Sequence, residues 1–282
     1  MNATLPDDWS PADNPYAIAV SEANWLRATV VLTVERMHSD DVQVGWFSSR
    51  QIDARTLVVA LRQLLAAVKL ERIALNDLGM PPAVVTALDE AEQRFLEALP
   101  DIKHVRDGLT HFEDWARGIG FGPQAAARKR ATPRDVARYF WSFGYDPATD
   151  NVTMGPFTIS VNEAVPAANT LCAAIYAAAH AVDQRNTAEL RIHVVQALDD
   201  AAIACTAPQG PVLVSQGNDM RVWLSINLST VPTGELGDLA QRVTSVLAST
   251  GLRLAPPTFP QAEDITDRLV AGEVLRVERH NQ

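Results

Sequence analysis

The sequence predicts a mainly α-helical protein, in which a helical bundle carrying a β-hairpin is followed by a small α+β unit. Three observations predict it. Apolar residues recur at helical spacing through most of the first two-thirds of the chain, two short runs flanking turn residues interrupt that pattern between 137 and 161, and short strands and helices alternate in the last third. We divide the chain into a flexible arm (1–15), a bundle (16–185) and a C-terminal unit (186–282).

Composition narrows the class of protein. A chain of 282 residues with 47% hydrophobic content can bury a core without disulfides, and Cys172 and Cys205 lie in apolar surroundings that suit buried thiols. No run approaches the roughly 20 uninterrupted apolar residues of a membrane helix, and the acidic, proline-containing first residues do not resemble a signal peptide. We therefore expect a cytoplasmic protein that does not bind membranes.

The first elements follow from prolines and apolar periodicity. Three prolines within residues 1–15 indicate a flexible arm. Residues 21–38 are expected to form a helix capped by Ser21, although the β-branched run 29–31 would also suit a strand. Residues 53–79 and 83–98 show the clearest helical periodicity, and Asp101 is placed to cap a fourth helix.

The remaining elements are shorter. Residues 137–145 and 151–161 flank turn residues and predict the hairpin, and alanine-rich residues 162–182 predict another helix. The C-terminal unit is expected to contain helices at 188–204 and 234–249 and strands at 212–215, 222–228 and 252–254, giving a small antiparallel sheet.

The fourth helix has two faces. One carries an apolar stripe expected to join the core, and the other carries His104, Asp107, Gly108, His111 and Trp115. Glycine permits close approach and tryptophan anchors interfaces, so Gly108 and Trp115 predict a homodimer interface. A helix buried on both sides within its own bundle explains the same pattern equally well.

Residues 106–111 read Arg-Asp-x-x-x-His, with Arg106, Asp107 and His111 as the specific positions. This motif resembles that of the HEPN superfamily (higher eukaryotes and prokaryotes nucleotide-binding domains), whose members are helical bundles, commonly dimeric. Many are metal-independent ribonucleases that build one site from the motifs of two chains. The resemblance implies a HEPN-like endoribonuclease of a toxin or defence system, with no cofactor.

The residue types suit that chemistry. Histidine moves protons near neutral pH, and arginine contacts phosphate oxygens through its planar fork. Asp107 precedes His111 by one helical turn, so it is placed to orient the imidazole. The alternative is that Arg106 forms an ion pair with Asp101 or Glu113 and that His111 only fills an interface.

Three other groups of residues are candidates for binding RNA, a metal ion or phosphate. The net charge of −10 opposes long-range attraction to nucleic acid, so RNA contacts should be local, and Arg128, Lys129 and Arg130 are the best candidates, although such a run often lies in a solvated loop. His104, Asp107 and His111 lack a recognised metal-site spacing, and no metal is expected. Residues 118–122 read as a helix stop and hinge rather than a phosphate loop.

Two functional hypotheses result. The first is a homodimeric, metal-independent endoribonuclease with RNA as substrate. The second is a non-catalytic dimeric scaffold, in which the fourth helix forms the interface and the C-terminal unit binds a protein partner.

Overall fold

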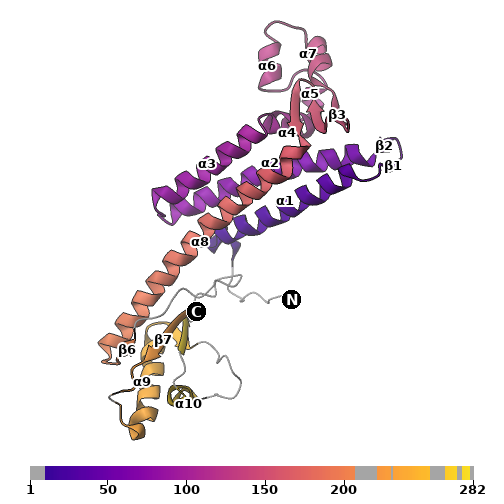
Figure 1. Ribbon diagram of the computed structural model, residues 1–282. Coiled ribbons are helices and arrows are strands. Elements are labelled where there is room, and N and C mark those ends of the chain that lie inside the picture. Colours follow the sequence, from indigo (N-terminus) through magenta and orange to yellow (C-terminus); the bar gives the residue numbers. More distant parts are fainter. Residues whose placement is uncertain (1–9, 207–220, 230, 255–263, 272–274, 280–282) are drawn as a thin grey trace. The chain divides into compact units, whose positions relative to one another are not determined.

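The computed structural model describes residues 10–206, 221–229, 231–254, 264–271 and 275–279 (Figure 1). The protein is mainly helical with small sheets, as the sequence predicted. The chain divides into two compact units, which meet in the sequence between Ala179 and His180. This division lies close to the predicted one at residue 185.

Helix α1 (Pro15–His38) begins earlier than predicted. Ser21 is not its cap, because Pro15 occupies the first helical turn, where its fixed φ suits the helix and its missing N–H costs nothing. A short 3₁₀ helix, η1 (Pro11–Asp13), precedes it. The predicted arm is therefore wrong for residues 10–15, which are helical or cap a helix, and residues 1–9 lie outside the described residues.

Helices α2 (Ser49–Asp77) and α3 (Pro82–Ala98) confirm the two clearest predictions from periodicity. Helix α1 packs along α2 (Figure 1). The buried side of α2 is lined by leucines, among them Leu57, Leu61, Leu64 and Leu75. A two-stranded hairpin that the sequence did not predict, β1 (Gln43–Val44) and β2 (Phe47–Ser48), joins α1 to α2.

The fourth helix is shorter than predicted. Helix α4 (Ile102–Thr110) ends where His111 takes a non-helical conformation, with φ −108° and ψ 42°, and the four-residue α5 (Phe112–Trp115) follows. Two further short helices, α6 (Pro123–Ala127) and α7 (Pro133–Phe140), come before the sheet. The prediction of one continuous helix through Trp115 is therefore wrong.

The predicted hairpin is a three-stranded antiparallel sheet. Strands β3 (Phe143–Asp146), β4 (Asn151–Met154) and β5 (Phe157–Ser160) lie in that order, with Tyr145 opposite Val152 and Val152 opposite Ile159. Residues 137–140, predicted as strand, belong to α7, which starts at Pro133 with the Thr132 hydroxyl accepting a hydrogen bond from the Asp135 N–H. The predicted second strand is split by a turn at Gly155, whose φ is +57°.

Helix α8 (Val161–Asp200) unites the two helices predicted at 162–182 and 188–204. The polar residues between them include no glycine or proline, and Arg185 pairs with Glu189 one turn later at 3.5 Å, so nothing there ends a helix. By length and composition α8 is long and apolar enough to cross a membrane, and 44% of its apolar 18-residue window is buried within the chain. Core helices share these properties, so the expected cytoplasmic location remains a prediction.

The second unit contains a four-stranded antiparallel sheet of order β6 (Cys205–Thr206), β7 (Arg221–Ile226), β9 (Leu275–Arg279) and β8 (Leu252–Leu254). Helix α9 (Leu236–Ser249) follows η2 (Thr233–Glu235) and, with the end of α8, covers a core that includes Val194, Val243 and Leu275. Helix α10 (Ile265–Val270) and β9 were not predicted, and the strand predicted at 212–215 lies outside the described residues.

Gly118 provides a test of this packing. Its φ is +70°, and a Cβ built there would lie 1.9 Å from the Pro133 carbonyl oxygen of α7; Gly79 has φ +62° but open space around it. Gly79→Ala should cost about 1–2 kcal/mol from backbone strain alone. Gly118→Ala should cost at least about 1 kcal/mol more, because its Cβ would also overlap the Pro133 carbonyl oxygen. Urea unfolding followed by circular dichroism measures both, and equal losses would show that the α7 contact is wrong.

Candidate functional site

The motif residues lie over a cluster of aromatic side chains. The Trp115 ring meets Phe140 edge to face at 6.0 Å and Phe157 at 6.2 Å, and Phe140 and Phe157 are 5.9 Å apart. Only 2% of Trp115 is exposed. The cluster therefore joins α5, α7 and β5 and fixes the end of α4 above them.

Gly108 and Trp115 do not present the predicted interface. A Cβ at Gly108 would lie 2.5 Å from Met154 Cε and 3.1 Å from Trp115 Cε3, so the glycine allows α4 to approach β4 and α5 of its own chain. Both residues are buried within the chain, which is the alternative that the sequence left open. The homodimer remains a prediction, without these two residues as its anchors.

The residues after Trp115 form a loop held by two polar side chains. The Gln124 side chain, which is fully buried, accepts a hydrogen bond from the Gly120 N–H at 2.9 Å and donates one to the Trp115 carbonyl at 3.0 Å. Arg128 donates to the carbonyls of Gly118 and Gly120, at 3.3 and 3.1 Å. The predicted hinge is thus tied down by buried hydrogen bonds.

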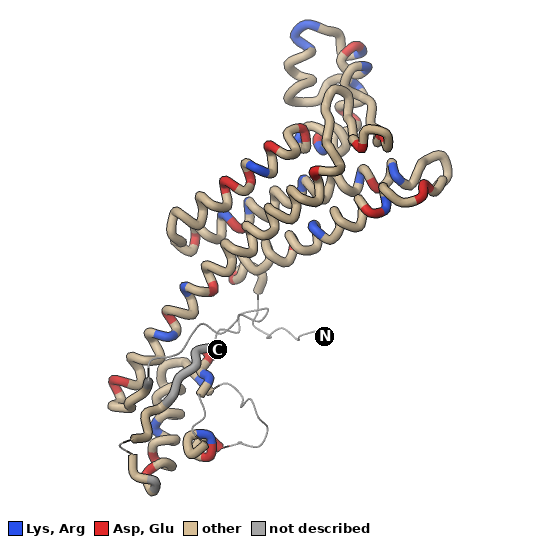
Figure 2. The backbone as a smooth tube through the Cα atoms, in the orientation of Figure 1, with Lys and Arg blue, Asp and Glu red and all other residues tan. Residues whose placement is uncertain are grey.

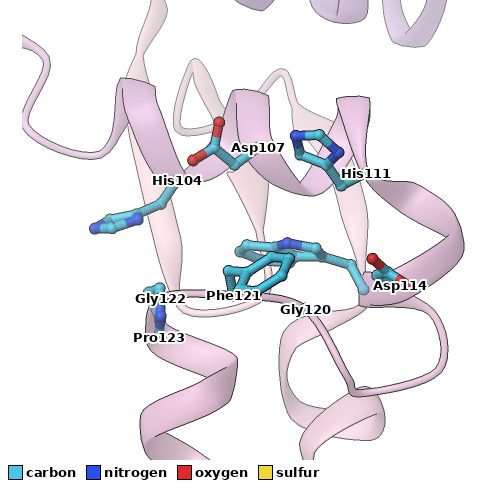
Figure 3. Close-up of a pocket in the computed structure, with 9 residues that line it drawn as sticks. His104, Asp107, His111, Asp114, Gly120, Phe121, Gly122 and Pro123 are labelled. Atoms are coloured by element: carbon cyan, nitrogen blue, oxygen red, sulfur yellow. The ribbon is translucent and has the colours of Figure 1, made fainter.

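A pocket of about 170 Å³ lies between α4 and this loop. Figure 3 shows the side chains of His104, Asp107 and His111 extending from the helix on one side, with the loop on the other. The full lining comprises His104, Asp107, His111, Asp114, Trp115, Gly120, Phe121, Gly122 and Pro123. It therefore combines two imidazoles, two carboxylates and two aromatic rings.

The two histidines lie in different surroundings. The His104 ring stacks on Phe157, with centroids 4.6 Å apart and an interplanar angle of 30°, whereas His111 is exposed at the junction of α4 and α5. Among the described residues, the structure gives no hydrogen bond to the His111 imidazole. The break in the helix therefore leaves this side chain accessible from solvent and at the edge of the pocket.

Arg106 and Asp107 pair with each other. Arg106 Nη1 donates to Asp107 Oδ1 at 3.0 Å, and the Arg106 side chain is 30% exposed. Asp101, one of the two partners that the sequence offered for Arg106, instead accepts a hydrogen bond from the Thr158 N–H of β5 at 2.9 Å. Asp107 is thus turned to Arg106 rather than to His111, and Arg106 itself does not line the pocket.

The basic run is divided between two roles. Arg128 Nη1 binds the carbonyls of the loop, and the predicted contact of Arg128 with RNA stays a prediction. Lys129 and Arg130 are exposed at the turn between α6 and α7, where Figure 2 shows a segment of positive charge. These two remain candidates for contacting phosphate.

No three His, Cys, Asp or Glu side chains in the described part of the chain are grouped so as to hold a metal ion. Comparison with protein-family models, curated proteins and solved structures found no match to this chain. The resemblance to the HEPN superfamily therefore depends on the motif residues alone.

Sequence reasoning found one side of the pocket. Helical spacing placed His104, Asp107 and His111 on one face, and the structure brings them together. It missed Asp114, Phe121 and the supporting Gln124, because their positions depend on the helix break and the loop that follows. Glycines at 118, 120 and 122 were the one available signal of a constrained loop.

Replacing Gln124 tests whether the loop depends on it. Gln124→Met keeps most of the side-chain volume but leaves the Gly120 N–H unpaired in a buried site and removes one of the two hydrogen bonds to the Trp115 carbonyl, which should cost about 2 kcal/mol. Gln63→Met on the exposed side of α2 is the matched control and should change stability little. Denaturant unfolding of both variants gives the comparison, and similar midpoints would contradict the assigned role.

Proposed function

We propose that the protein is a HEPN-like, metal-independent endoribonuclease that acts as a homodimer. The observation that carries the proposal is the exposed His111 imidazole, at a helix break and sharing a pocket with a second imidazole, that of His104. Two imidazoles at one site can act as a general base and a general acid without a metal ion.

The proposed reaction is transesterification of the RNA backbone. One imidazole accepts the proton of the ribose 2′-hydroxyl, the 2′-oxygen bonds to phosphorus, and the bond from phosphorus to the 5′-oxygen breaks. The other imidazole donates a proton to that oxygen. The products are a 2′,3′-cyclic phosphate and a 5′-hydroxyl, and no oxidant or metal is consumed.

Arg106 is assigned to the phosphate. Its bond to Asp107 uses one nitrogen of the guanidinium, so the rest of the planar fork, on a partly exposed side chain, is available to phosphate oxygens. Because Arg106 lies outside the lining of the pocket, a second copy of the chain that brings its own motif to the cleft would complete the site.

A second candidate is the non-catalytic dimeric scaffold. The β1–β2 hairpin favours it, because Val42, Val44, Trp46 and Phe47 are all exposed there, Trp46 by 93%. Apolar groups gathered on one exposed hairpin mark interaction surfaces. Under this reading the protein binds partners and leaves RNA intact.

Substitution of His111 separates the two candidates. Purified protein in the presence of a chelator should cleave RNA to 2′,3′-cyclic phosphate ends, and His111→Ala should lower the rate by about 10²- to 10⁴-fold. His193→Ala, an exposed histidine of the second unit, is the control and should retain wild-type activity. Analytical ultracentrifugation and melting curves establish that each variant keeps its assembly and fold.

Arg106 variants test the phosphate contact. Arg106→Ala should reduce cleavage strongly, and Arg106→Lys should restore only part of it, because lysine keeps the charge and loses the planar fork. Wild-type protein that leaves RNA uncleaved would eliminate the nuclease and favour the scaffold. Folded His111→Ala that cleaves at the wild-type rate would instead show that His111 is not catalytic.

A further inference from the structure

The lining of the pocket favours a ligand with hydrogen-bond donors over a phosphate group. Asp107 and Asp114 line it, and its lining includes no lysine or arginine. A phosphate there would face two carboxylates, whereas a group rich in N–H donors would find acceptors. An RNA ligand has such a group in its bases, which also suit the aromatic rings of the lining.

We propose that this pocket receives an unpaired guanine of single-stranded RNA, stacked on Phe121, with Asp114 accepting hydrogen bonds from its Watson–Crick edge. The assignment to RNA rests on the proposed function. It names the substrate preference of the same site, and it places the phosphates outside the pocket, toward Arg106.

Phe121 carries the stacking. Its ring is 82% exposed although the backbone beneath it is fixed, since Gly120 is bonded through both its N–H and its carbonyl, to Gln124 and Arg128. Hydrogen bonds therefore stabilise the backbone of this loop, although its largest side chain lies outside the core. A fixed, exposed aromatic ring at the edge of a pocket is a platform on which a base can stack.

Asp114 carries the preference for guanine. Asp107 is occupied by Arg106 at 3.0 Å, whereas the ion pair of Asp114 with Arg117 is long, 3.9 Å, and Arg117 is largely exposed. Guanine presents two neighbouring N–H donors, at N1 and N2, which one carboxylate can accept together, as it does from arginine. Adenine, cytosine and uracil each present a donor beside an acceptor, which a carboxylate matches less well.

The volume fits one base. Pockets for drug-sized ligands begin near 300 Å³, so a pocket of about 170 Å³ suits a single ring system rather than a whole nucleotide. Ribose and phosphate would then lie at the rim, where His111 is exposed and His104 is partly exposed. Base recognition and proton transfer are thus assigned to adjoining parts of one site.

Binding of non-cleavable RNA tests the inference apart from catalysis. The probes are short, fluorescein-labelled 2′-O-methyl oligoadenylates with guanine, inosine or adenine at the centre, titrated with the full-length protein by fluorescence anisotropy. Inosine keeps the N1 donor and lacks the 2-amino group. Wild-type protein should bind the guanine probe about tenfold more tightly than the other two, in keeping with the discrimination of a good bidentate contact.

Matched variants identify the residues. Phe121→Leu should weaken binding of all three probes about tenfold through lost stacking, whereas Phe112→Leu, an exposed phenylalanine outside the pocket, should not. Asp114→Asn should abolish the preference for guanine over inosine, whereas Glu113→Gln, its exposed neighbour, should preserve it. All four positions are at least partly exposed, and melting curves confirm the fold of each variant.

The outcomes separate this inference from the nuclease proposal. If guanine binding depends on Phe121 and Asp114 but wild-type protein cleaves no RNA, the nuclease proposal fails and the guanine pocket stands. If the protein cleaves RNA but binds the three probes equally, the guanine pocket is overturned and the nuclease proposal is unaffected. The same holds if Phe121→Leu weakens probe binding no more than Phe112→Leu does. Absence of binding to any probe also overturns it.

Discussion

Burial of the Trp115 ring is the constraint on which the candidate site depends. The ring packs against Phe140 and Phe157, and to reach them the chain leaves the helical path at His111. Gly108, Thr110 and His111 are all poor helix formers, so the break costs little locally, whereas a buried tryptophan contributes a large apolar area. Tertiary packing therefore decides the conformation of this segment. It ends α4 at His111, whose side chain is exposed.

The same packing requires small residues at two places. Beyond Gly108, a Cβ on Gly120 would lie 2.7 Å from Trp115 Cδ1, so the loop approaches the indole closely from the other side. That approach buries backbone polar groups, and Gln124 and Arg128 supply their hydrogen bonds. These contacts join the tryptophan, the two glycines and the two polar side chains into one packed unit. The pocket lies on the outer surface of that unit.

The sequence predicted those parts of the fold that depend on local pattern. Long amphipathic segments such as α2 and α3 were found because their periodicity is strong, and the antiparallel sheet of the second unit was anticipated from turn residues between short runs. The break at His111 was not predicted, since it follows from contacts between distant residues such as Trp115 and Phe140. The α7 helix lies where a strand was predicted, although Thr132 and Pro133 are local signals of a helix start. The hairpin at 43–48 was missed because its strands are only two residues each.

The availability of charged side chains at the candidate site also could not be predicted from the sequence. The sequence between residues 101 and 130 has six basic and four acidic residues, an excess of two positive charges. In the folded chain Arg106 is paired with Asp107, Arg117 lies near Asp114 and Arg128 binds the loop carbonyls. The exposed cations there, Lys103, Arg117, Lys129 and Arg130, are few for a protein of net charge −10, and a ligand with few phosphate contacts gains little from counterion release. Affinity for RNA at this site would therefore have to come mainly from contacts to the base, and a pocket that joins aromatic rings to carboxylates provides contacts of that kind.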